Sequence, residues 1–351
     1  MTSAAAVEPL PYNRREAEAA IGEDWENIVR SAFRWMILGR TLDARMQALQ
    51  RQGRVGFYGA ATGQEAVNVA AGMASSPADW VFPGLREQLV ALVRGHALET
   101  YVHHLFADAR DPALGRNMPC HPTAREVHYV SMSSVIGTQI SQAAGLALGL
   151  KRRGEPAAAM AFFGDGATSS NDFHAGMNFA GVLRLPVLFC CTNNQWAISV
   201  PVSRQTASSS LAAKSSAYGF SGERIDGTDF LGVYRTLTES LHRIRSGGGP
   251  ELVEFVVYRM TPHSSSDDPG RYQPAEWMRA AAQHDPFERL SSWLDTHRIL
   301  SVEERAAWTT EAEHSVRGAI EEAERTPAPP DSSVSEGVYA VPSVASGLKG
   351  G

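Results

Sequence analysis

The spacing of apolar side chains predicts that the first third of the chain is mostly helical. From Asp24 to Gln52, apolar residues recur at steps of three and four, which places them on one face of a helix. Gly53 ends this helix, and the segment 64–74 is again helical in pattern. Two further short helices are expected within residues 83–108. A helical region therefore precedes the main run of strands.

The pattern changes after Tyr129, because apolar runs typical of buried strands then alternate with helical segments. Alternation of this kind predicts βαβ units, whose parallel strands form a sheet that is covered by helices on both faces. We therefore expect an α/β fold with helical extensions at its N-terminal and C-terminal ends. The expected strands are 157–163, 186–191, 222–227 and 250–260, and the expected helices are 138–154, 169–183, 211–219, 230–246, 285–298 and 302–325.

A single domain is expected to hold most of the chain. The assigned parts are a flexible N-terminal segment at 1–23, one α/β domain at 24–327 and a weakly ordered tail at 328–351. Ser301 and Glu304 are spaced as a capping box, which predicts the start of the last helix. The polar segment 261–274 is too long for a simple turn, and long loops at strand ends often carry function.

The composition excludes some classes of partner. The 351 residues carry a formal net charge of −6, from 32 Lys and Arg against 38 Asp and Glu, with no basic stripe that would follow a phosphate backbone. We expect no nucleic-acid partner, and no membrane association because no apolar window is long enough to span a bilayer. The three cysteines have no metal-binding or redox spacing, so we expect a cytoplasmic protein with reduced thiols.

Two loops that follow predicted strands carry the candidate chemistry. Gly164, Asp165 and Gly166 come directly after the strand 157–163, and Asn194 follows the next strand along the chain. In an open α/β sheet, ligands bind beyond the carboxyl ends of the strands. Glycines allow the backbone to approach a ligand closely, and the helix that follows offers free N–H groups to an anion. These features predict a diphosphate site.

The same two loops predict a magnesium site. An Asp carboxylate and an Asn carbonyl are oxygen ligands suited to Mg²⁺, which commonly takes further oxygens from phosphates. Asp165 and Asn194 are 29 residues apart, and this pairing resembles the thiamin diphosphate signature, whereas Gly-Asp-Gly alone occurs in many plain turns. The chain has neither the GxGxxG pattern of dinucleotide-binding domains nor the lysine pattern of P-loops.

From about Ile37 to Pro327 the chain resembles the α subunit of the thiamin diphosphate-dependent 2-oxoacid dehydrogenases, the decarboxylating first component. The resemblance is carried by "RQGRVGFYGAATGQEA", "DWVFPGLRE", "SSVIGTQISQAAG", "GDGATS" and "NNQWAIS". "GRNMPCHP" and "PHSSSDD" look most like branched-chain 2-oxoacid members, and pyruvate members of some bacteria have a similar histidine-containing loop. The resemblance implies the thiamin diphosphate-binding fold.

The resemblance also implies which residues contact the cofactor. Asp165, Asn194 and the backbone carbonyl of Trp196 would bind Mg²⁺, although relatives usually have Tyr at the position of Trp196. Arg86 would contact the diphosphate, and the protein would depend more on this contact because Thr192 replaces a charged residue of some relatives. The other implied cofactor contacts are Leu85 (often Tyr in relatives), Ser134, Ile136, Gly164, Gly166, Ala167 and His263.

Three further roles are implied by the resemblance. Phe57 and His121 match positions that face the substrate in branched-chain relatives. His263 matches the active-site loop histidine, and an ordinary pKa near ~6.5 would let it carry a proton at neutral pH. We expect it to be catalytic, bonded to the diphosphate and donating a proton during acyl transfer to lipoamide. The positions that match a monovalent-cation site of some members, with K⁺ as the candidate ion, are Ser133, Thr138 and Gln139.

The implied activity requires other chains. Activation of thiamin diphosphate normally needs a Glu at the pyrimidine ring, and we find no second α/β domain that would supply one. The resemblance implies a β subunit, with two copies of each chain, and the lipoyl domain of a dihydrolipoyl acyltransferase as acyl acceptor. The expected function is oxidative decarboxylation of a branched-chain 2-oxoacid. Alternatives are a pyruvate or acetoin dehydrogenase α subunit, or a non-catalytic scaffold of the same fold, which the departure "SSND" at 169–172 keeps open.

Overall fold

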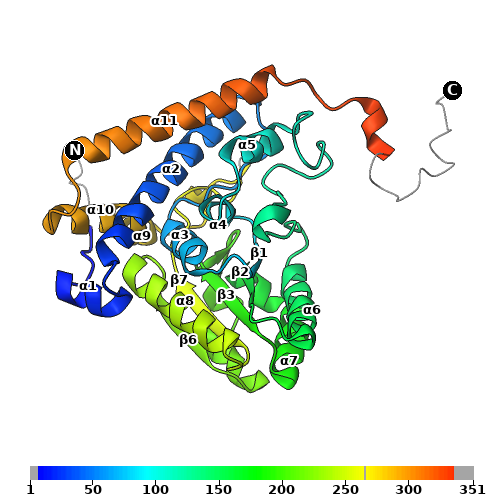
Figure 1. Ribbon diagram of the computed structural model, residues 1–351, viewed down its shortest axis with the longest axis vertical. Coiled ribbons are helices and arrows are strands. Elements are labelled where there is room, and N and C mark those ends of the chain that lie inside the picture. The colour runs from blue at the N-terminus through cyan, green and yellow to red at the C-terminus, as the bar shows by residue number, and fades with distance from the viewer. Residues whose placement is uncertain (1–6, 265, 336–351) are drawn as a thin grey trace.

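A five-stranded parallel sheet forms the centre of the protein. The computed structural model describes residues 7–264 and 266–335 (Figure 1). The strands stand in the order β1-β2-β3-β7-β6, and each pairs in parallel with its neighbours. The bounds are β1 Trp80–Phe82, β2 Ala159–Gly164, β3 Val187–Asn193, β6 Gly222–Asp226 and β7 Glu251–Val256, with a separate antiparallel pair of β4 Trp196–Ala197 and β5 Val200–Pro201. The predicted α/β fold with a parallel sheet is confirmed.

Helices cover both faces of this sheet. Side chains of β2 alternate between them: Met160 and Phe162 join the larger hydrophobic cluster, with α2, α3 and α8, whereas Ala161 and Phe163 join the smaller cluster, with α6 and α7. The helices are α1 Arg14–Ile21, α2 Trp25–Arg51, α3 Glu65–Ala74, α4 Gln88–Val93, α5 Leu98–Phe106, α6 Thr138–Arg153, α7 Asn171–Leu183, α8 Phe230–Arg245, α9 Ala275–Gln283, α10 Pro286–Thr296 and α11 Val302–Arg325. None of these helices combines the length and the apolar character needed to span a bilayer.

Helices from the N-terminal and C-terminal parts of the chain pack together in a layer beside the sheet. Helix α11 lies along α2 (Figure 1), and Arg30 bridges them by donating to Glu304 at 2.6 Å. Ser301 and Glu304 form the predicted capping box at the start of α11. This layer brings residues from the first third of the chain to the edge of the sheet at which the later strands end.

The described part of the N-terminal segment makes contacts with the C-terminal helices. Residues 1–23 were expected to be flexible, but α1 begins with a complete capping box between Asn13 and Glu16. The backbone around Glu8 is also held by Gln283 and Arg289, which lie far away in the sequence. Local patterning could not reveal this docking because its partners lie in the C-terminal helices. Residues 14–21 form a helix, residues 1–6 lie outside the described residues, and the flexibility expected of the segment 1–23 stays a prediction.

Other elements differ in their bounds. Strand β1 and helix α9 were not predicted, since a strand of three residues and a short helix after a long loop leave weak periodic signals. The predicted helix 169–183 begins at Asn171, because residues 165–169 form a 3-10 turn. The predicted helix 211–219 is a 3-10 helix over 212–218. Of the predicted weakly ordered tail, 331–335 form a 3-10 turn, and 336–351 lie outside the described residues.

The packing of α6 against α7 yields a stability prediction. A Cβ on Gly176 of α7 would lie 2.9 Å from Ile140 Cγ2 and 3.2 Å from its backbone carbonyl carbon. Gly176→Ala is expected to lower the free energy of unfolding by about 1–3 kcal/mol, because the two helices would have to separate. Gly149→Ala in α6, where no atom lies within 4 Å, should instead raise it by up to about 1 kcal/mol. Urea denaturation of both variants checks this, and an unchanged or raised stability of Gly176→Ala would contradict it.

Candidate active site

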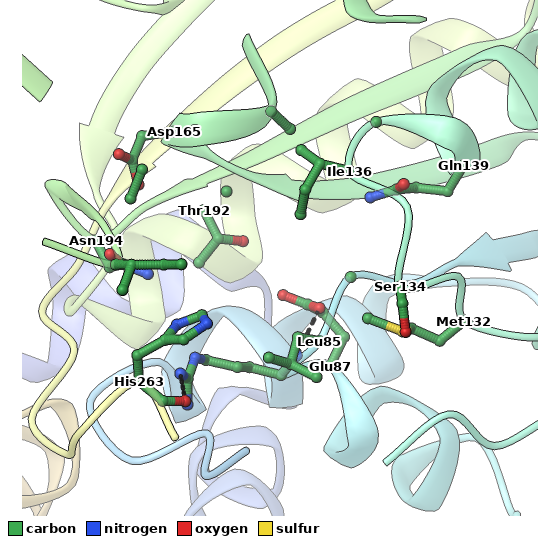
Figure 2. Close-up of a pocket in the computed structure, with 18 of the residues that line it drawn as sticks. Leu85, Glu87, Met132, Ser134, Ile136, Gln139, Asp165, Thr192, Asn194 and His263 are labelled. Atoms are coloured by element: carbon green, nitrogen blue, oxygen red, sulfur yellow. Dashed lines mark hydrogen bonds between the residues drawn. The ribbon is translucent and has the colours of Figure 1, made fainter. Parts of the chain in front are cut away.

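A cavity of about 420 Å³ opens at the carboxyl edge of the sheet, between the sheet and the helical layer. Figure 2 shows Asp165, Asn194 and His263 on one side of it and Ser134 and Gln139 on the other. Thr138 is the one predicted site residue that does not line it. The predicted residues that do line it are Phe57, Leu85, Arg86, His121, Ser133, Ser134, Ile136, Gln139, Gly164, Asp165, Gly166, Ala167, Asn194, Trp196 and His263.

Strand register brings the two predicted loops together. Gly164, the last residue of β2, pairs with Thr192 of β3, so Asp165 and Asn194 leave neighbouring strands at nearly the same level. Gly166 is required for close packing there, because a Cβ would lie 2.8 Å from the Cβ of Ala197. Glycine at this position therefore allows the loop after β2 to pack directly against the loop after β3.

Asp165 is a buried carboxylate at the bottom of this junction, with 1% of its surface exposed. Its Oδ2 atom accepts a hydrogen bond from Gln205 Nε2 at 2.7 Å. Burial raises the pKa of Asp165 to about 6, because the charged form is poorly solvated there. Asn194 Oδ1 accepts from the backbone N–H of Trp196 at 3.2 Å. A buried carboxylate held by a single neutral amide is the kind of group that a bound cation stabilises.

Arg259 is a cavity residue that the sequence analysis missed. It is 2% exposed, and its guanidinium donates to the carbonyls of Trp196 and Ile198 at 3.2 and 2.9 Å and to Tyr272 Oη at 2.6 Å. The Trp196 carbonyl, predicted to bind Mg²⁺, thus already accepts one hydrogen bond and keeps its second lone pair for another partner. An Arg at the end of an apolar strand was the available sequence signal.

Arg86 presents a second buried guanidinium. It donates to the carbonyl oxygens of Ala60 and His263, the latter at 2.9 Å, and within the described residues it has no carboxylate at ion-pair distance. Burial and the nearby charge of Arg259 lower the pKa of Arg86 to about 10, so it stays protonated at neutral pH. Carbonyls orient such a cation without neutralising it, which leaves its charge to attract an anion into the cavity.

His263 does not have the ordinary pKa that the sequence suggested. Burial, followed by the positive charges of Arg86 and Arg259, lowers its pKa to about 4. The imidazole is therefore neutral at neutral pH in the ligand-free protein. Its backbone N–H donates to Asp267 Oδ2 at 2.7 Å, which holds the start of the loop at the cavity edge.

A hydrogen bond joins two predicted residues on the opposite wall. His121 Nε2 and Ser134 Oγ are 2.6 Å apart, and His121 Nδ1 lies 3.0 Å from the Pro119 carbonyl. Since a carbonyl can only accept, Nδ1 carries the proton and Nε2 accepts from the Ser134 hydroxyl. His121, predicted to face the substrate, and Ser134, predicted to contact the cofactor, are therefore joined by a hydrogen bond.

Two oxygen atoms of the cavity lining are buried without a hydrogen-bond partner in the described part of the chain: Thr192 Oγ1 and Gln139 Oε1. The amide nitrogen of Gln139 is used, because it donates to the Phe162 carbonyl at 2.8 Å. Buried polar atoms are normally paired, so these oxygens are suited to bind a ligand or cation. Over residues 7–264 and 266–335, no three His, Cys, Asp or Glu side chains gather as a metal site.

Glu87 is another cavity residue that was missed, although it directly follows Arg86 in the sequence. It is 4% exposed, and its Oε2 atom accepts from the backbone N–H of Arg86 at 3.1 Å. A Cβ on Gly84 would come within 2.9 Å of the same oxygen. Burial raises the pKa of Glu87 to about 7.

The chain is similar in sequence to known proteins of one family. The family model described as "Dehydrogenase E1 component" matches residues 33–332. The 2-oxoisovalerate dehydrogenase subunit alpha 1, mitochondrial, of Arabidopsis thaliana is 36% identical over 317 residues, covering 90% of this chain and 67% of that protein. In Bacillus subtilis (strain 168), the pyruvate dehydrogenase E1 component subunit alpha is 38% identical over 311 residues (88% and 81%) and the 2-oxoisovalerate dehydrogenase subunit alpha is 37% identical over 310 residues (88% and 94%).

The raised pKa of Glu87 predicts a pH-dependent stability. With a pKa of 4.5 when unfolded and about 7 when folded, the folded protein holds the proton more tightly, so stability falls as pH rises between these values. Glu87→Gln removes this titration. Its free energy of unfolding relative to wild type should therefore increase by up to about 3 kcal/mol from about pH 5 to about pH 8. Denaturant titrations at several pH values check this, with the exposed Glu313→Gln as control. A difference in free energy of unfolding between Glu87→Gln and wild type that does not change with pH would contradict this prediction.

Proposed function

This chain belongs to the dehydrogenase E1 component family, and we propose that it acts in the oxidative decarboxylation of a branched-chain 2-oxoacid, as the α subunit beside a β subunit. The observation that carries the proposal is one cavity in which Asp165, Asn194, Arg86 and His263 meet. The family depends on thiamin diphosphate. When bound, this cofactor supplies the electron sink that allows a 2-oxoacid to lose CO₂.

The residues of the cavity fit a magnesium diphosphate. Asp165 Oδ1, Asn194 and the free lone pair of the Trp196 carbonyl supply oxygen ligands, and Mg²⁺ takes further oxygens from phosphate. The buried positive charge of Arg86 favours the anion, and Gly166 lets the backbone approach it. Binding would place Mg²⁺ beside the negative charge of Asp165 and the diphosphate beside the positive charge of Arg86.

His263 is proposed to hold the proton that is used in acyl transfer. Burial, followed by the positive charges of Arg86 and Arg259, lowers the pKa of its imidazole to about 4. A bound diphosphate places negative charge beside those two cations, so it opposes their effect and raises the pKa of His263 toward its ordinary range. The cofactor would thereby convert a neutral imidazole into a group that can carry a proton at neutral pH.

The monovalent-cation site is proposed on a smaller set of residues than the sequence suggested. Gln139 Oε1 is buried in the cavity wall with no partner among the described residues, and Ser133 lines the same cavity. Thr138 starts helix α6 and does not line it. K⁺ bound by Gln139 and Ser133 would fix the loop that carries Ser134.

Exposed apolar side chains at the cavity mouth support the β-subunit proposal. Met118, Val135, Ile136 and Ile198 line the cavity and are between 53% and 65% exposed. Apolar groups gathered around a ligand site and left open to water mark a surface that another protein covers. We propose that the β subunit covers this mouth in an assembly of two α and two β chains, and that the lipoyl domain of an acyltransferase reaches the bound acyl group.

Removing the proposed metal ligand tests cofactor binding. Asp165→Ala is expected to abolish magnesium-dependent binding of thiamin diphosphate, because the ion loses its only carboxylate ligand from the cavity. Isothermal titration calorimetry of the full chain with its β partner measures this. Asp172→Ala, which removes an acid near the start of α7 outside the cavity, should bind normally. Equal affinities of wild type and Asp165→Ala would contradict the metal assignment.

The substrate proposal is tested by activity of the co-expressed α and β chains. The apolar lining by Phe57, Leu85 and Met132 favours a branched acyl chain, so kcat/KM for 2-oxoisovalerate should exceed that for pyruvate by about tenfold or more. Relatives of both kinds resemble this chain to a similar degree, so the measurement decides between them. A preference for pyruvate would contradict the branched-chain proposal. Cofactor binding without turnover would favour the scaffold alternative.

A further inference from the structure

A buried carboxylate lies behind the cavity wall on the helical side. Asp43 of α2 is 2% exposed and does not line the cavity. Its Oδ1 atom accepts from Tyr58 Oη and its Oδ2 atom from Thr62 Oγ1, each at 2.7 Å. Within the described residues, no basic side chain lies at ion-pair distance from it. Two hydroxyls, one on each oxygen, are therefore its closest partners, and Gln88 Nε2 donates to Oδ1 from 3.5 Å.

These two hydroxyls flank a short segment of the loop between α2 and α3. Residues 59–61 lie between Tyr58 and Thr62, so Asp43 ties down both ends of the segment at once. The Gly59 carbonyl accepts from Gln88 Nε2 at 3.2 Å, which adds a third attachment. The position of the next carbonyl, that of Ala60, is thereby fixed.

The Ala60 carbonyl is one of two that orient Arg86. The guanidinium donates one hydrogen bond to Ala60 and one to His263. The His263 carbonyl belongs to a long loop after β7, whereas the Ala60 carbonyl belongs to the segment that Asp43 restrains. The negative charge of Asp43 also faces Arg86 through the wall and favours its cationic form.

We propose that Asp43 is a positioning residue for Arg86: through Tyr58 and Thr62 it holds the Ala60 carbonyl where the guanidinium meets a bound diphosphate. This inference rests on the proposed function, since it assumes that Arg86 contacts the diphosphate. Asp43 touches neither the cofactor nor the substrate. It acts by fixing the position and favouring the charge of Arg86. Among the described residues, Arg86 is the guanidinium of the cavity wall that has no carboxylate at ion-pair distance.

Substitution of Asp43 separates positioning from simple stabilisation. Asn has nearly the same shape, but it is uncharged and its NH₂ group cannot accept, so the hydroxyl proton of either Tyr58 or Thr62 loses its acceptor. Asp43→Asn is expected to weaken magnesium-dependent thiamin diphosphate binding by about tenfold, which is the loss expected for one hydrogen bond to a charged group. Calorimetry on the full chain with its β partner measures the affinity, and thermal unfolding measures stability.

A control is provided by Asp79, a fully buried carboxylate at the amino end of the strands that accepts from the backbone of Ala158 and from Arg245. Asp79→Asn should lower stability and leave cofactor affinity unchanged. Thr62→Val and Thr62→Ser test the same path if Asp43→Asn does not fold. The Val variant should lose affinity, whereas the Ser variant, which keeps the hydroxyl, should retain it.

A double-mutant cycle gives the decisive readout. If Asp43 acts through Arg86, then Asp43→Asn should have little further effect on affinity in an Arg86→Lys background. Fully additive losses, or wild-type affinity in Asp43→Asn, would overturn the role of Asp43 while the proposed function stands. Failure of the wild-type protein to bind the cofactor would overturn both. The two failures are therefore distinguishable.

Discussion

The parallel register of β2, β3 and β7 is the constraint on which the candidate active site depends. Gly164 pairs with Thr192, and Asn193 pairs with Val256, so three successive strands of the sheet end at one edge. The residues that follow these strands therefore lie close together at that edge, so even short side chains reach the same cavity. Since strand side chains alternate between faces, a slip of one residue would exchange the two hydrophobic faces, and the buried residues on both faces hold the register in place.

The charges at this edge are held mainly by neutral groups rather than by one another. Arg86 and Arg259 rest mainly on carbonyl oxygens, and Asp165 accepts from an amide. Arg259 has Asp267 Oδ2 at 3.8 Å, whereas Arg86 and Asp165 have no opposite charge at ion-pair distance among the described residues, and burying such charges is unfavourable for folding. The lowered pKa of His263 has the same origin: burial contributes most, and the positive charges of Arg86 and Arg259 add to it.

The sheet supplies only half of the cavity. Phe57, Arg86 and His121 come from the helical first third of the chain, and the exposed apolar rim at Val135 and Ile136 precedes α6. Asp43 holds the loop that carries Phe57 within this second wall, and Arg86 joins that loop to the one after β7, on the side of the sheet. The geometry of the site therefore depends on helices that contribute no ligand themselves.

The sequence alone was sufficient for the α/β fold and for placing the loops after β2 and β3 at one cavity. Apolar periodicity and the Gly-Asp-Gly and Asn-Asn positions are local features, and strand direction alone places their loops at one edge. The tertiary structure decided the rest: the docking of α1 onto the C-terminal helices, the insertion of β7 between β3 and β6, the pKa of His263, and the places of Arg259, Glu87 and Asp43. Each of these depends on burial or on charges contributed by residues distant in the chain, and no local pattern of residues records such contacts.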